Sequence, residues 1–263
     1  MARVDVEYFT DPADPLSWAA EPALRRVQVE FGAEVGISYV MGGLARQVGD
    51  GAAVARELLE GAAASGMPAD ARLWLDGPPS STYPACLAVK AAAEQRMEGA
   101  VLRVLREGFM VDRRRQDNAD ALLAAVRHVP GLDVARFEVD LHSNAIVEAF
   151  GADLERARAA GREGEPLPLP AWIVRGDGEE LLVTREEGPT ALREAVLAAG
   201  AEPGPALPTP EEVVRRFPRI ATAEVAAACD LPGPRAPAEL WELALKWRVQ
   251  AERVLGGEMW SPA

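Results

Sequence analysis

The sequence contains few of the residues that form covalent cross-links or bind transition metals. Its 263 residues include two cysteines, Cys86 and Cys229, and two histidines, His128 and His142. The cysteines are far apart and belong to no paired motif, so the sequence supports neither a disulfide framework nor a cysteine-type zinc site. We therefore predict a protein with no metal site and no cofactor.

Long apolar runs and an excess of basic residues are also missing. No apolar run approaches the roughly 20 residues of a membrane-spanning helix, and the N-terminal M-A-R-V-D-V-E-Y has acidic residues where a signal peptide would be apolar. The 28 Lys and Arg are outnumbered by 41 Asp and Glu, which gives a formal charge of −13. Nucleic acids and anionic membranes bind clustered basic residues. We expect a cytoplasmic protein that binds neither.

The N-terminal residues predict a strand, a helix and a second strand. Residues 4–9 alternate and are rich in strand-forming residues, and apolar residues recur at helical spacing from Ser17 to Phe31. Residues 34–41 again favour a strand, so this is a βαβ unit with parallel strands and a right-handed crossover.

The following hundred residues are mainly helical. Helices are expected at roughly 50–65, 83–98, 99–111, 117–128, 133–142 and 143–160. Strand patterns return at 170–174 and 180–184, and a helix follows at 189–200. This is an α/β fold in which a βαβ half and a ββα half flank a helical insertion at about 46–165. The linker 201–210 is rich in Pro and Gly, so we predict two domains, 1–200 and 208–263.

The C-terminal module, residues 208–263, has the outline of a winged helix. Three short helices precede a strand hairpin. The module holds seven Lys or Arg and eight Asp or Glu, and D-L-P-G-P-R-A-P starts the would-be recognition helix without a basic face. This composition argues against DNA binding. Trp241, Trp247 and Trp260 favour docking on the main domain or on a protein partner.

Four stretches together resemble the DsbA-like branch of the thioredoxin fold. They are D-P-A-D-P-L-S-W-A-A-E-P after the first strand, V-M-G-G-L after the second, S-S-T-Y-P-A-C-L-A-V-K-A-A at a helix start, and L-P-A-W-I-V before the third strand. That branch contains FrnE-type oxidoreductases, 2-hydroxychromene-2-carboxylate isomerases and kappa-class glutathione transferases. The resemblance covers roughly residues 3–200 and implies a thioredoxin-like fold.

The resemblance also implies which chemistry is missing. In redox members, Cys-x-x-Cys begins the first helix, where free backbone N–H groups and the helix dipole lower the pKa of the first thiol. The resemblance places Asp14 at the first cysteine position and Ser17 at the second, so the motif becomes Asp-Pro-Leu-Ser. We therefore predict no thiol-disulfide oxidoreductase activity; the name oxidoreductase would reflect family descent only.

Asp14 and Ser17 are the candidate catalytic residues, with two interpretations of Asp14. It can cap the helix, with Pro15 at the first helical position, or it can be a catalytic carboxylate. Helix N–H groups are expected to lower its pKa and make it a poor base at neutral pH. A carboxylate at this position would repel a glutathione thiolate, which argues against glutathione chemistry.

A second predicted element is Leu169-Pro170. The resemblance makes Pro170 the cis-proline beside the turn. Either the backbone of Leu169 offers hydrogen bonds to an extended peptide, or the proline serves only the geometry of the fold. The complete predicted binding surface is Asp14, Pro15, Leu16, Ser17, Trp18, Tyr83, Leu169 and Pro170.

Two functions remain open. The first is a non-redox, adaptor-like protein that binds a peptide or protein partner, as DsbA-like protease adaptors do. The alternative is an isomerase or glutathione-transferase-like enzyme that binds a small molecule in the same cleft. A deep pocket on which Asp14, Ser17 and Tyr83 converge would favour the enzyme, and a shallow apolar groove would favour the adaptor.

Overall fold

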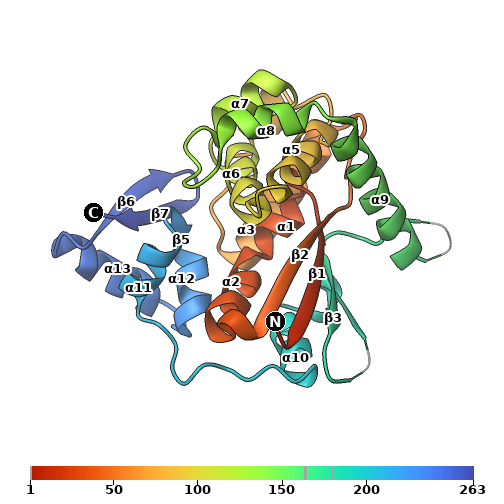
Figure 1. Cartoon of the computed structure of the whole chain (residues 1–263). Coiled ribbons are helices and arrows are strands. Elements are labelled where there is room, and N and C mark those ends of the chain that lie inside the picture. Colours follow the sequence, from red (N-terminus) through yellow and green to blue (C-terminus); the bar gives the residue numbers. More distant parts are fainter. Residues whose placement is uncertain (1, 163–164, 179) are drawn as a thin grey trace.

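The computed structural model describes residues 2–162, 165–178 and 180–263. Its main sheet has the order β2-β1-β3-β4 (Figure 1). The strands are β1 (Val4–Thr10), β2 (Val35–Met41), β3 (Ala171–Arg175) and β4 (Leu181–Thr184). β1 and β2 are parallel, and β3 is antiparallel to both β1 and β4. The predicted thioredoxin-like fold, with its βαβ and ββα halves, is confirmed.

Alternating side chains of the sheet pack against helices on both of its faces. Val4, Val6 and Tyr8 of β1 are buried on one face, with apolar residues of α2 (Glu21–Glu30) and α10 (Ala191–Ala198). Phe9 points to the other face and packs in a cluster with Ala157 of α9. This is the period-two pattern of a strand that is covered on both sides.

The predicted helix at 17–31 is in fact two helices. α1 (Pro15–Ala19) ends at Ala20, and α2 begins at once with Pro22 in its first turn. Proline has no N–H to donate and clashes with a preceding helical turn, so the continuous helix is interrupted there.

Helices fill the chain between β2 and β3, as expected for the insertion. They are α3 (Gly51–Ser65), α4 (Arg72–Asp76), α5 (Tyr83–Ala93), α6 (Glu98–Met110), α7 (Ala119–Val126), α8 (Val134–Leu141) and α9 (Asn144–Ala160). Only α4 was not predicted, because its five residues are too few for a periodic pattern. Trp18, Trp74 and Phe109 lie in the large apolar core that these helices share with α1.

The C-terminal module is a winged helix. Its elements are α11 (Pro210–Arg216), β5 (Ile220–Ala221), α12 (Thr222–Cys229), α13 (Arg235–Leu245), β6 (Val249–Val254) and β7 (Gly257–Pro262). They form an antiparallel sheet of order β5-β7-β6 with the helices packed on it. This confirms the predicted outline and adds β5, which is only two residues long. The domain bounds 1–200 and 208–263 stay a prediction.

The module docks on α2 of the main domain, mainly through α12 (Figure 1). The tryptophans do not make this contact. Trp260 is buried in the module's own core and donates to Thr222 Oγ1 at 2.8 Å, whereas Trp241 and Trp247 are 42% and 86% exposed. The expectation that tryptophans dock the module on the main domain is therefore wrong, because one of them completes the small core of the module.

Among the described residues, no helix is both long enough and apolar enough to cross a membrane.

Candidate functional site

Asp14 caps helix α1, as one of the two interpretations predicts. Its carboxylate accepts hydrogen bonds from the backbone N–H of Leu16 at 3.3 Å and of Ser17 at 2.8 Å. The Ser17 hydroxyl donates to the same carboxylate, and Thr10 Oγ1 donates to Ser17 Oγ at 2.8 Å. The side chains of Asp14 and Ser17 thus bind each other.

The turn is buried. Asp14 is 2% exposed and Ser17 is fully buried. Helix α3 lies against α1 so closely that a Cβ on Gly61 would be 3.2 Å from the Cβ of Ala19. Burial, together with the nearby Asp11 carboxyl, raises the pKa of Asp14 to about 6, although the hydrogen bond from Ser17 acts to lower it. The expectation of a lowered pKa is wrong, because loss of hydration outweighs the cap hydrogen bonds.

Arg106 of α6 connects this turn to a cluster of buried charges. Its guanidinium donates to Thr10 Oγ1 at 2.5 Å and to the Asp11 carbonyl at 3.2 Å, and it forms an ion pair with Glu21. Burial acts to raise the pKa of Glu21, but Arg103, Arg106 and Arg25 outweigh it, so the pKa is lowered and the carboxylate stays ionised.

The cluster continues into the C-terminal module through Glu224 of α12. This carboxylate is fully buried and accepts from Arg25 Nη2 at 3.0 Å, from Arg103 Nη1 at 2.9 Å and from Arg103 Nη2 at 2.7 Å. It also accepts from the backbone N–H of Ala221 at 2.9 Å. One hydrogen-bonded network therefore joins the turn, α2, α6 and the module.

The other predicted site residues lie near the turn but do not converge on it. The Leu169–Pro170 bond is cis, as expected. The Leu169 carbonyl already accepts from Arg185 Nη1 at 3.2 Å. The Tyr83 ring packs edge-on against Phe150 of α9, with centroids 5.0 Å apart. Thr82, next to Tyr83, reaches the turn and donates to Asp11 Oδ2 at 2.8 Å.

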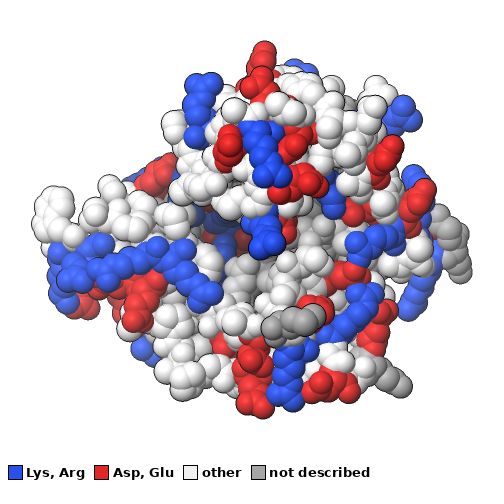
Figure 2. Space-filling view, in the orientation of Figure 1, with Lys and Arg blue, Asp and Glu red and all other residues white. Residues whose placement is uncertain are grey.

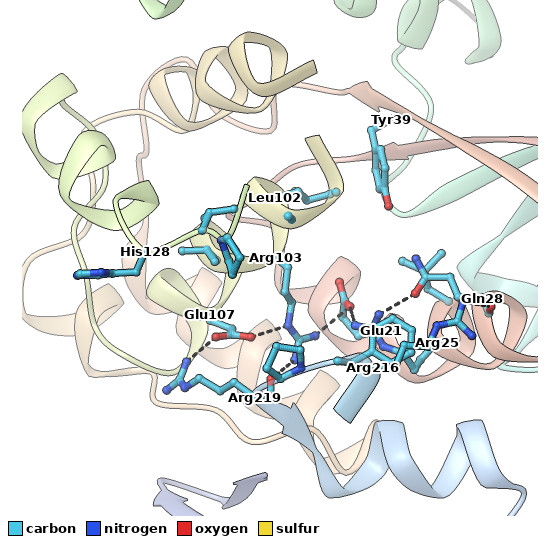
Figure 3. A pocket seen from close by; sticks show the side chains of 18 residues that line it. Glu21, Arg25, Gln28, Tyr39, Leu102, Arg103, Glu107, His128, Arg216 and Arg219 are labelled. Carbon is cyan, nitrogen blue, oxygen red and sulfur yellow. Dashed lines mark hydrogen bonds and ion pairs between the residues drawn. The ribbon is translucent and has the colours of Figure 1, made fainter. Parts of the chain in front are cut away.

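The described residues line an open pocket of about 610 Å³ between the main domain and the module, away from the turn. We call it the interdomain pocket. It is lined by α2, α6, Tyr39 of β2, the segment 128–130 and the segment 216–219 (Figure 3). Its apolar lining includes Leu24, Leu102, Val104, Val129, Phe217 and Pro218. Figure 2 shows the surface hollowed where the module meets the main domain.

Neither Asp14, Ser17 nor Tyr83 lines the interdomain pocket. The sequence interpretation missed this pocket because its walls come from segments spread between residues 21 and 219. His128 is exposed and forms part of the wall. The only local signal is R-F-P-R at 216–219, an aromatic residue between arginines just before β5.

A family model described as thioredoxin matches residues 8–166. The chain belongs to the thioredoxin family. Among solved structures, it is similar to the cytosolic disulfide reductase DsbM from Pseudomonas aeruginosa, with 18% identity, a TM-score of 0.60, and 74% of this chain and 96% of that one covered. A probable DsbA oxidoreductase from Streptomyces coelicolor has 19% identity and a TM-score of 0.56, with 73% and 89% covered. These structures confirm the DsbA-like fold.

Curated relatives match nearly the whole chain. The ClpXP adapter protein SpxH of Halalkalibacterium halodurans is 28% identical over 278 residues, which covers 98% of this chain and 88% of the relative. SpxH of Bacillus licheniformis is 28% identical and SpxH of Bacillus subtilis 26% identical, with the same coverage. These relatives are named as ClpXP adapters and not as redox enzymes.

Proposed function

We propose that this protein is a cytoplasmic, non-redox adapter that binds a protein substrate and presents it to a ClpXP-type protease. The observation that carries the proposal is the extent of the match to the SpxH adapters, 98% of the chain. The DsbM reductase matches only 74%. The difference is about a quarter of the chain, close to the length of the linker and the winged-helix module together.

The chemistry of the cysteines supports the non-redox part of this proposal. Cys86 is fully buried, and burial, together with the nearby Asp11 carboxyl, raises the pKa of its thiol well above the ordinary value. Burial also raises the pKa of Cys229 to about 12. A thiol must ionise to attack a disulfide, so neither cysteine is suited to that reaction at neutral pH.

We propose that the predicted site residues divide into two groups by exposure. Six are buried and stabilise the turn from within: Asp14, Pro15, Ser17, Trp18, Leu169 and Pro170. Leu16 and Tyr83 are half-buried, and these are the two that a protein partner would contact. An enzyme that binds a small molecule at this turn is not favoured, because α3 covers α1.

The experiment is a degradation assay with purified components. Candidate substrates are proteins that co-purify with this chain and accumulate in cells that lack ClpX. Each candidate is incubated with purified ClpXP and ATP, with and without this protein. Because an adapter raises the local concentration of substrate at the protease, we expect degradation at low substrate concentration to accelerate about tenfold or more.

Two controls separate the proposal from its alternatives. Without ATP, no degradation is expected. In a parallel assay of insulin reduction by dithiothreitol, this protein should not accelerate the reaction. Equal degradation rates with and without this protein, for every candidate, would rule out the adapter role, and rapid insulin reduction would rule out the non-redox interpretation.

A further inference from the structure

The interdomain pocket has apolar walls and a charged floor whose ions already pair with one another. Arg103 pairs with Glu107 at 2.6 Å and with Glu21 at 2.9 Å (Figure 3). Arg25 pairs with Glu224 at 3.0 Å. Such paired ions have little remaining charge to offer a ligand. The paired charges therefore shape the pocket, and its apolar lining residues determine which ligands it can bind.

Arg216 differs from the other arginines of the pocket. Within the described residues it forms no ion pair; it donates to the Gln28 carbonyl at 3.1 Å and stacks on the Phe217 ring, 5.1 Å from the centroid. It lies at the end of α11, where it is exposed and lines the pocket. This is a positive group beside an apolar surface, with no carboxylate partner among the residues that the structure describes.

Ion pairs and stacked guanidinium groups hold segment 216–219 in place. Arg219 has a φ of 63°, in the left-handed region that non-glycine residues rarely adopt. Its guanidinium is fixed by Glu107 at 2.6 Å, Asp112 at 2.6 Å and Glu252 at 2.9 Å. Arg25 and Arg216 stack on Phe217, with Arg25 4.1 Å from its centroid. An unfavourable backbone that is fixed this firmly is typical of functional sites.

We propose that the interdomain pocket binds a short peptide segment of a protein partner, in which an apolar side chain is followed or preceded by an acidic one. The apolar side chain would pack against Phe217 and Leu102, and the carboxylate would pair with Arg216. The net charge of −13 opposes the approach of an acidic segment, so its affinity comes from local contacts. This inference deepens the adapter function and rests on it, since the segment would belong to the delivered substrate.

The experiment uses the full-length protein and an array of eight-residue peptides. Each peptide has one Leu or Phe next to one Asp or Glu in a Gly and Ser background, and each has a partner peptide with Asn or Gln at the acidic position. The strongest binder is labelled with fluorescein and its affinity is measured by fluorescence anisotropy. We expect the acidic peptide to bind about tenfold or more tightly than its amide partner, as for a charge-assisted hydrogen bond.

Three variants locate the binding. Arg216→Glu reverses the unpaired charge and should reduce affinity for the acidic peptide at least tenfold. Ala100→Trp places a large ring on an exposed residue of the lining and should block the peptide. Arg253→Glu makes the same charge reversal on an exposed residue of the module that does not line the pocket. This variant should bind the acidic peptide with the affinity of the wild type. The circular dichroism and melting temperature of each variant confirm that it is folded.

The outcomes separate this inference from the adapter function. If no peptide binds, or if Arg216→Glu and Ala100→Trp bind the peptide as the wild type does, the peptide site is disproved. If the small amphipathic anion 8-anilinonaphthalene-1-sulfonate binds, Ala100→Trp abolishes its binding and no peptide competes, the pocket binds small molecules and the peptide proposal is wrong. If Ala100→Trp stimulates degradation by ClpXP fully, the adapter function stands but does not use this pocket.

Discussion

Asp14 is a helix cap whose charge is poorly hydrated. Its hydrogen bonds with Ser17 and Leu16 favour the carboxylate, yet burial raises its pKa from the ordinary 3.8 to about 6. The folded protein binds this proton more tightly than the unfolded chain, so protonation of Asp14 stabilises the fold. This stabilisation is fully present below about pH 3.8. It is lost as the pH rises through about 6.

Replacing Asp14 by Asn tests this directly. Asparagine keeps a capping oxygen but cannot ionise. Between pH 4 and pH 7 the unfolding free energy of the wild type should fall by about 2–3 kcal/mol relative to Asp14→Asn, measured by urea unfolding at several pH values. Other titrating groups contribute equally to both proteins and cancel in the difference. Parallel pH profiles would show that the pKa of Asp14 is not raised.

At the scale of elements, the contact of α3 with α1 keeps the turn buried. Gly61 allows this contact, since any Cβ there would meet Ala19. Gly61→Val should destabilise the protein by about 1–3 kcal/mol through overpacking and speed up amide hydrogen exchange at residues 11–18. Ala63→Val, on the exposed face of the same helix, is the matched control and should leave both unchanged. Unchanged exchange in Gly61→Val would mean that α3 does not cover the turn.

The elements of the fold could be predicted, but most of the buried polar contacts could not. The strands 4–9 and 34–41, the cis Leu169–Pro170 bond and the helix start at Asp14 follow from local patterns and from the family resemblance. The helix break at Pro22 was also visible locally and was missed. Glu224 and Arg25, however, are 199 residues apart in the sequence. Nothing in a local pattern shows that such a glutamate will be buried among arginines, because that pairing is created by tertiary packing.

At the scale of the whole molecule, Glu224 joins the winged-helix module to Arg25 and Arg103 of the main domain through buried ion pairs. Glu224→Gln would leave Arg25 and Arg103 with less negative charge around them in a buried site. Removing one partner of a buried ion pair costs about 3–5 kcal/mol, so urea unfolding should show a loss of that order. Glu239→Gln removes an exposed partner of Arg235 on the same module and should cost less than about 1 kcal/mol. If Glu224→Gln and Glu239→Gln lowered the unfolding free energy by equal, small amounts, the buried network would not hold the module on the main domain.

Cutting the linker tests whether the module is held by this interface or only by the chain. A protease site inserted between Ala206 and Leu207 lies in a stretch without helix or strand. After cleavage, the two pieces should elute together in size-exclusion chromatography, since the buried contacts of Glu224 with Arg25 and Arg103 do not depend on the linker. The cleaved Glu224→Gln protein should separate into two peaks, whereas cleaved Glu239→Gln should not. If the wild-type pieces separate on cleavage, the linker holds the module, and the interdomain pocket would open whenever the module moves away.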